Sequence, residues 1–127
     1  MTERGFLVDF SEAAQNEVEQ IGQADRGAKS PGKDLRHLLW ASIDNDDSLD
    51  LDQLTVAEIL PDQTVKILVA VADVDALVKK RSAIDEHARQ NTTSVYTAGK
   101  VFPMLPEKLS TDLTSLNYHK DRPVLVV

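Results

Sequence analysis

Apolar residues recur at helical spacing near the start of the chain. The recurrence, at intervals of three to four positions, predicts an amphipathic helix over about 10–21. Asp9, followed three positions later by Glu12, is typical of a helix N-terminus. The next stretch, 22–33, has three glycines, one proline and no apolar period, which predicts a flexible connector. Residues 1–33 are therefore expected to form a helix and a linker, ahead of an organised domain over 34–127. The recurring residues are Phe10, Ala14, Val18 and Ile21.

Strand-like and helical runs alternate in the organised part. Three strand-like runs come first, and a segment of turn composition, 61–64, separates the second from the third. We expect the three to be neighbours in one sheet. The predicted fold class is α+β, with a mixed, largely antiparallel sheet and flanking helices. The predicted strands cover 38–43, 54–60 and 65–72, the helices 74–80, 83–90 and 106–116 with a proline in its first turn, and the short extended segments 94–97 and 101–105.

The sequence closes on an apolar, strand-like run, Pro123-Val-Leu-Val-Val127. A terminal strand normally finishes with a turn or a polar tail, so we interpret this ending as the sign of a domain that continues. We therefore expect exposed apolar surface and self-association through the exposed edge.

Composition narrows the classes of function. The chain has 127 residues and a formal charge of −7, which excludes a basic nucleic-acid clamp that works by bulk charge. The absence of cysteine excludes disulfides, thiolate nucleophiles and sulfur-ligated metals. The longest apolar run, 67–72, is far shorter than the roughly 20 residues that cross a bilayer. No signal-peptide pattern opens the chain, so no membrane association and a cytoplasmic location are expected.

Much of the acidity lies in one segment. Five aspartates fall within the nine residues 44–52, between two predicted strands. Like charges held this close need a counter-charge, and oxygen ligands favour a hard ion such as Mg²⁺ or Mn²⁺. A solvated acidic loop explains the composition equally well. A calcium-binding EF-hand is not expected, because the glycine and the final glutamate of that loop are missing in either register that starts at Asp44 or Asp46.

Four segments, in the same order, resemble the RNB domain of the ribonuclease II and ribonuclease R family. Asp44-Asn-Asp-Asp-Ser-Leu-Asp-Leu-Asp-Gln53 resembles its Ile-Asp-x5-Asp-x-Asp-Asp signature. Val69-Ala-Val-Ala-Asp-Val74 and Thr93-Ser-Val-Tyr96 resemble two further family segments, and Phe102–Asn117 resembles its Pro-Met-Leu-Pro-Glu-Lys-Leu-Ser block. The resemblance runs from about residue 34 to residue 127, which would make this part a partial RNB-type catalytic domain.

The resemblance implies a hydrolytic, Mg²⁺-dependent exoribonuclease that degrades single-stranded RNA from the 3′ end to nucleotide monophosphates. It implies Asp44, Asp50, Asp52 and Gln53 as metal ligands, with Asp50 and Asp52 catalytic and Asp52 the more essential. Tyr96 would match the aromatic residue that packs against a base of the RNA. Aromatic stacking holds a base without reading its identity, which suits a nuclease that acts on any sequence.

Two departures from the family pattern keep a second hypothesis open. Gln53 stands where the signature most often has a fourth aspartate, and it brings a ligand oxygen without a negative charge. The family's domain also continues past the equivalent of Val127, where an arginine cluster and most of the RNA channel lie. The alternative is therefore a truncated, non-catalytic remnant that binds metal or RNA weakly or acts as an interaction subunit.

The remaining polar and aromatic candidates are expected to have structural roles. No two histidines stand at a metal-ligand spacing, Asp73 follows a predicted strand as a helix cap, and Trp40 is expected in the core. A short basic run, 79–81, is expected to be a solvated helix end. The histidines are His37, His87 and His119.

Overall fold

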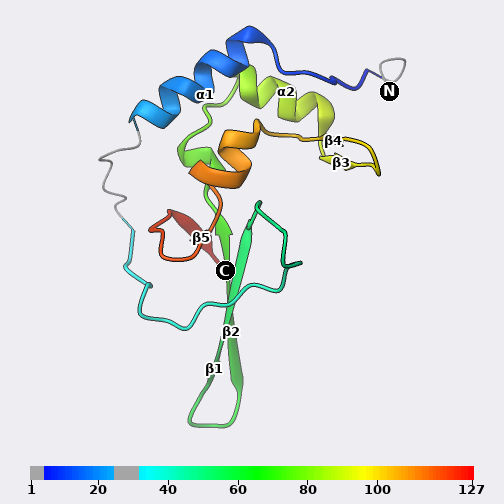
Figure 1. Cartoon of the computed structure of the whole chain (residues 1–127). Coiled ribbons are helices and arrows are strands. Elements are labelled where there is room, and N and C mark those ends of the chain that lie inside the picture. The colour runs from blue at the N-terminus through cyan, green and yellow to red at the C-terminus, as the bar shows by residue number, and fades with distance from the viewer. Residues whose placement is uncertain (1–4, 25–31) are drawn as a thin grey trace.

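The computed structural model describes residues 5–24 and 32–127 of the chain. Helices gather at one end of the molecule and a β-hairpin projects from the other, as Figure 1 shows. The elements, in chain order, are α1 (Glu12–Ala24), β1 (Gln53–Ile59), β2 (Val65–Ala72), η2 (Val74–Ala76), α2 (Ala83–Asn91), β3 (Val95–Tyr96), β4 (Val101–Phe102), η3 (Lys108–Leu113) and β5 (Val124–Val126).

The helical end holds the hydrophobic core. Helix α1 presents its apolar stripe to α2 and η3, so the N-terminal helix shares one core with the part of the chain that follows the sheet. Glu17 of α1 accepts a hydrogen bond from the backbone N–H of Ile84 at 3.2 Å, which satisfies a free donor in the first turn of α2. The buried core residues are Ala14, Val18, Val78, Ile84, Leu109 and Leu113.

Two antiparallel sheets complete the fold. The larger has the order β1-β2-β5, and the smaller pairs β3 with β4. In the larger sheet Gln53 faces Val71 and Ile59 faces Val65, so β1 and β2 form one regular hairpin. Every pairing between the described strands is antiparallel. The α+β prediction with a largely antiparallel sheet is therefore confirmed.

The strand predicted over 38–43 is wrong. This segment makes one isolated bridge, in which Ala41 and Thr55 exchange backbone hydrogen bonds of 3.0 and 2.8 Å. Leu39 and Ile43 are exposed on either side of the bridge. A strand needs a partner along its length and burial of one face, and this segment has neither. Trp40 is accordingly half-buried, with its indole N–H donating to the Leu35 carbonyl at 2.9 Å, and the prediction of a core tryptophan is wrong.

Of the helices predicted after the sheet, one is confirmed and two are shorter than predicted. Helix α2 begins at the predicted residue and ends one residue later, whereas the helix predicted over 74–80 is only the short turn η2. The turn ends at Ala76, and the chain then passes through Arg81, which takes a left-handed conformation with φ of 66°, to the start of α2. The helix predicted over 106–116 is shorter and of the wide π type, with the Thr114 N–H donating to the Leu109 carbonyl. Pro106 stands just before it, as predicted for its first turn.

Helix caps explain the other boundary differences. Helix α1 starts at Glu12 because Ser11, rather than Asp9, accepts from a first-turn N–H, that of Ala14, at 3.2 Å. Asp73 does cap η2, accepting from the Ala76 N–H at 3.2 Å, which confirms that prediction. Helix α1 also runs on through residues 22–24, which were predicted to belong to the linker, so that boundary prediction is wrong. The rest of the predicted linker lies mostly at 25–31, outside the described residues. None of the described helices has the length and apolar character needed to cross a membrane.

One histidine has a structural role and two lie on the surface. His87 of α2 is only 5% exposed, and its ring packs on Phe10 with the ring centroids 4.0 Å apart. His37 is exposed, and His119 is exposed beside Tyr118.

Candidate active site

The aspartate loop, residues 44–52, joins the bridge at Ala41 to the start of β1. The Ala72 N–H donates to the Asp52 carbonyl at 2.9 Å, which fixes Asp52 where β2 ends. One residue earlier, the Leu51 carbonyl accepts from the Leu116 N–H at 2.8 Å. The C-terminal half of the loop is therefore tied to two other segments of the chain, while Asp46 and Asp47 remain exposed.

Asp50 and Tyr96 meet at this loop. The phenol of Tyr96, from β3, donates a hydrogen bond to Asp50 Oδ2 at 2.8 Å. This bond, with some burial and the negative charge of Asp50, raises the pKa of the Tyr96 phenol, because a phenolate would lose the bond and repel the carboxylate. Tyr96 is still 65% exposed. Its hydroxyl is thus anchored while its ring remains accessible to a ligand.

The Asp52 carboxylate has a raised pKa. Its side chain is accessible to solvent, yet the protein atoms around it partly desolvate the carboxylate and raise its pKa. Asp50 and then Asp44 raise that pKa further by charge repulsion. In the structure, the charges of Asp44 and Asp50 therefore act on Asp52. Their separation along the sequence did not by itself ensure this proximity.

Asp44 and Gln53 line a shared hollow of about 340 Å³ beside the loop. Its other walls come from the bridge segment, 41–43, and from Thr55 of β1. The two predicted ligands at the ends of the signature thus face one depression, while Asp50 turns toward Tyr96.

The donor set fits a hard cation by its chemistry and charge. All four predicted ligands offer oxygen atoms, which Mg²⁺ and Mn²⁺ prefer. Desolvation, and then repulsion by Asp50 and Asp44, raises the pKa of Asp52, and a bound cation would offset the repulsion. However, no three His, Cys, Asp or Glu side chains in the described ranges stand close enough to hold an ion between them. Metal binding would require these carboxylates to draw together.

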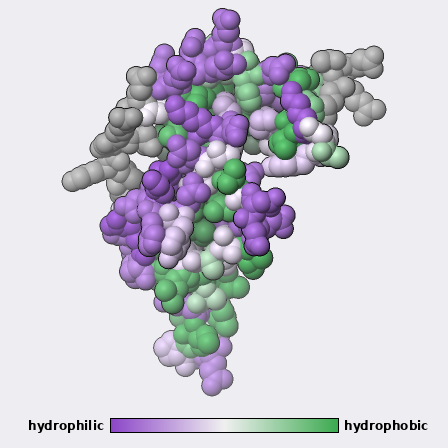
Figure 2. Space-filling model, viewed as in Figure 1, coloured by the Kyte–Doolittle hydropathy of each residue, from purple (hydrophilic) through white to green (hydrophobic). Residues whose placement is uncertain are grey.

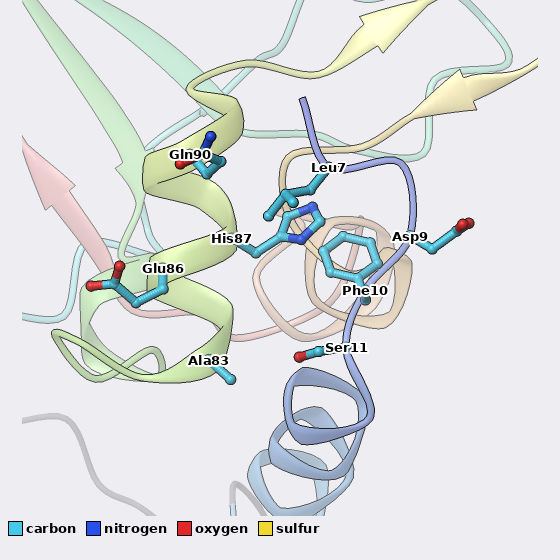
Figure 3. Close-up of a pocket in the computed structure, with 8 residues that line it drawn as sticks. All are labelled: Leu7, Asp9, Phe10, Ser11, Ala83, Glu86, His87 and Gln90. Atoms are coloured by element: carbon cyan, nitrogen blue, oxygen red, sulfur yellow. The ribbon is translucent and has the colours of Figure 1, made fainter. Parts of the chain in front are cut away.

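The larger pocket lies elsewhere, between the N-terminal segment and α2. Figure 3 shows His87 packed against Phe10 in this pocket, with Leu7 and Gln90 beside them. Asn91 ties the segment down, donating to the Leu7 carbonyl at 2.8 Å and accepting from its N–H at 2.9 Å. None of the predicted site residues lines this pocket. Its contacts attach the N-terminal segment to the core.

Sequence reasoning missed the residues that hold the aspartate loop in place. Ser115 and Leu116 supply these contacts from the segment that follows η3. Ser115 is one of several hydroxyl residues in that segment, and nothing in the sequence distinguishes it from Ser110 or Thr114. A pairing with residues more than 60 positions away leaves no local signature.

Comparisons with known proteins identify the family of the chain. The family model described as "RNB domain" matches residues 32–127. The chain is 37% identical over 119 residues to ribonuclease R of Vibrio parahaemolyticus, covering 93% of this chain and 14% of that protein. It is 38% identical over 103 residues to exoribonuclease 2 of Haemophilus ducreyi, covering 78% of this chain and 16% of that protein. The similarity to the Vibrio protein extends into α1, beyond the motifs.

A solved structure gives the same result for the fold. Ribonuclease R of Mycoplasma genitalium, in complex with ribose-methylated single-stranded RNA, superposes with a TM-score of 0.84 at 29% identity. The match covers 99% of this chain and 20% of that one. The chain thus spans about one seventh of the length of the curated relatives named above. Because the family model covers most of the chain and the fold matches that of a ribonuclease R, the chain belongs to the RNB domain family.

Proposed function

We propose that the chain carries part of a Mg²⁺-dependent exoribonuclease that hydrolyses single-stranded RNA from its 3′ end to nucleotide monophosphates. The observation that carries this proposal is the hydrogen bond from Tyr96 to Asp50, beside an Asp52 whose pKa is raised in part by Asp50 and Asp44. An accessible aromatic ring and a group of carboxylates at one place suit RNA hydrolysis, because one can hold a base and the others a metal.

The carboxylates would hold the ion. Asp44, Asp50 and Asp52 would supply charged oxygens, and Gln53 a neutral amide oxygen, to Mg²⁺ or Mn²⁺. When bound, Mg²⁺ would polarise the scissile phosphate and lower the pKa of a water molecule. Asp52 stands where β1 begins and β2 ends, so the sheet holds its backbone in place while RNA binds. A cation bound there would also offset the negative charge of the loop where a phosphate group approaches.

Tyr96 would have two tasks. Its exposed ring can stack on a base near the 3′ end, and stacking is worth about 1–3 kcal/mol per base without reading its identity. Its hydroxyl restrains the Asp50 carboxylate, which limits the positions that this ligand can adopt. The residue thus connects RNA binding to the geometry of the carboxylates.

A second candidate is a non-catalytic chain that binds metal or RNA weakly or serves as an interaction subunit. One observation favours it: no three carboxylate or histidine side chains in the described part of the chain already stand together as metal ligands. Gln53 in place of a fourth aspartate would also weaken metal binding, because it removes one negative charge.

One assay separates the two candidates. Single-stranded RNA labelled at the 5′ end, and in parallel at the 3′ end, is incubated with the purified chain in Mg²⁺ or in EDTA. Release of labelled mononucleotide from the 3′ end, lost in EDTA and in the Asp52→Asn variant, supports the exoribonuclease. RNA binding without mononucleotide release supports the second candidate. Hydrolysis that persists in EDTA or in Asp52→Asn contradicts the proposed metal site.

We also propose that the projecting hairpin, a different surface from the edge expected from the sequence, mediates self-association. Ile59 and Val65 pair across β1 and β2 near its tip, and they are 81% and 58% exposed. Figure 2 shows hydrophobic residues along this hairpin. Apolar surface gathered on one projecting element is typical of an interface, and a second copy of the chain is the occupant that we propose.

A further inference from the structure

The segment 103–117 carries a large part of the resemblance to the family, yet it supplies none of the proposed ligands or RNA contacts. Most of its apolar residues pack in the core, as expected of a helical segment. Ser115 is different, because it is a polar side chain with no exposed surface at all. A fully buried hydroxyl in a small domain needs partners, and the identity of its partners indicates its role.

The two shortest hydrogen bonds of the Ser115 side chain are made on either side of Asp50; a third, longer contact of 3.3 Å joins its Oγ to Asn117 Oδ1, which shares the same proton. Ser115 Oγ donates to the Leu49 carbonyl at 2.8 Å and accepts from the Leu51 N–H at 3.1 Å. A hydroxyl group has one proton to donate and two lone pairs, so these bonds use the donor and one acceptor. A single buried oxygen thus binds the backbone immediately before and immediately after one aspartate.

The neighbours of Ser115 strengthen this attachment. The Leu116 N–H donates to the Leu51 carbonyl at 2.8 Å, so Leu51 is held on both of its backbone groups. Arg122, whose side chain is mostly buried, donates from Nε to the Ser115 carbonyl at 3.3 Å and from Nη2 to the Asp112 carbonyl at 2.7 Å. Arg122 thus holds the backbone of Ser115, which in turn holds the loop. A shift of the loop would disturb this buried hydrogen-bond network.

We propose that Ser115 is a positioning residue for Asp50, which keeps the carboxylate beside Tyr96 by fixing the backbone on both of its sides. Its contribution to metal binding and hydrolysis rests on the proposed function. Its effect on the place of Asp50 does not, because the hydrogen bond between Tyr96 and Asp50 reports that place without any metal or RNA.

The substitution Ser115→Ala tests the proposal, because it removes the oxygen and adds no volume. Thr114→Val is the matched control: Thr114 is also buried, but its hydroxyl bonds to the Leu109 carbonyl within η3 and makes no contact with the loop. Each variant loses one buried hydroxyl next to the same backbone. An effect of general destabilisation would appear in both, and an effect on Asp50 only in the first.

Three measurements on the full 127-residue chain give the answer. In Ser115→Ala, hydrogen exchange at the Leu51 amide should accelerate by about 5-fold or more, in line with the loss of one hydrogen bond. The nuclear Overhauser effect between the Tyr96 ring and the Asp50 β-protons should weaken. The dissociation constant for Mn²⁺, followed by water proton relaxation, should rise by about 10-fold, the lower end for loss of a group that orients a ligand. Thr114→Val should change none of these.

The outcomes separate this proposal from the proposed function. Unchanged Leu51 exchange and an unchanged Tyr96–Asp50 signal in Ser115→Ala would overturn it, as would equal changes in Thr114→Val. If Ser115→Ala fails to fold, hydrogen exchange in the unaltered chain tests the proposal instead. A Leu51 amide that exchanges as fast as the amide of exposed Asp46 would overturn it. If the unaltered chain binds no Mn²⁺, the proposed metal site fails, and the exchange and proton measurements still decide the role of Ser115.

Discussion

The hydroxyl of Tyr96 donates to Asp50 Oδ2 at 2.8 Å across 46 positions of sequence. This bond joins β3, the only described strand that carries a predicted RNA-binding residue, to the loop that carries the predicted metal ligands. The bond holds the hydroxyl of Tyr96 in place, while the aromatic ring remains exposed. The predictions for this site follow from that arrangement and from the charge around Asp52.

Tyr96→Ala should weaken the binding of single-stranded RNA by about 5- to 150-fold, which corresponds to the loss of about 1–3 kcal/mol of stacking on one base. Tyr96→Phe keeps the ring and loses only the bond to Asp50, so most of the RNA affinity should remain. Fluorescence anisotropy with a labelled oligonucleotide measures both. Equal losses in the two variants would show that the hydroxyl, rather than the ring, makes the contact with RNA.

Asp52→Asn should raise the melting temperature at pH 7 while reducing RNA hydrolysis. The raised pKa of Asp52 means that its charged form is disfavoured in the folded chain, so a neutral isostere relieves desolvation and repulsion by Asp50 and Asp44. For the same reason, the unaltered Asp52 should favour folding at acidic pH, an effect that is lost as pH rises through its pKa in the folded chain. Hydrolysis should fall by about 100-fold or more, because removing a proposed metal ligand should reduce activity at least as much as removing a residue that only orients a ligand.

Asp47→Asn is the control for that experiment, because Asp47 is an exposed aspartate of the same loop with no proposed role. It removes the same charge and should leave hydrolysis nearly unchanged. A matching loss of activity in Asp47→Asn would indicate that total loop charge, not the place of Asp52, governs catalysis. Calorimetry and the labelled-RNA assay supply the two measurements.

His87 should make the chain less stable in mild acid. Burial lowers the pKa of His87, and its Nε2 lies 3.0 Å from Asn91 Nδ2, an amide that can only donate. The unfolded chain therefore binds a proton before the folded chain does, and stability should fall as pH drops from about 6.5 toward the pKa of the folded state. The melting temperature should decrease by about 3 °C between pH 7.5 and pH 5.

His87→Phe should reduce that pH dependence, since it removes the titrating group and keeps a ring against Phe10. His37→Gln serves as the control, because it removes a histidine that is exposed and lies outside this pocket. An undiminished pH dependence in His87→Phe would assign the effect to other groups, of which Asp9 and Glu86 line the same pocket.

Ile59→Lys should reduce self-association of the chain. A charge at this exposed position of the hairpin would oppose burial against a second copy, whereas Lys66→Ile on the same strand pair should not reduce association. Sedimentation velocity over a range of concentrations measures the change. A chain that remains monomeric at all concentrations before any substitution would contradict the proposed interface.

Local patterns were sufficient for part of this fold. Strand β2 and helix α2 are defined by their own apolar spacing and by caps such as Ser82, which accepts from the Asp85 N–H. The segment 38–43 has an equally apolar pattern, but its side chains find no core and its backbone meets β1 only at Ala41. Whether an apolar run becomes a strand depends on a partner, and the partner is set by the fold as a whole.

The sequence by itself determined the family, the class of fold and the residue types of the candidate site, because the aspartate spacing and the motif order are properties of the chain alone. Only the tertiary structure decided which of those residues meet. It set Tyr96 against Asp50, placed Asp44 and Gln53 in one hollow and put a buried Ser115 behind the loop. Such contacts join positions tens of residues apart, and their formation depends on core packing and sheet register, which no local pattern encodes.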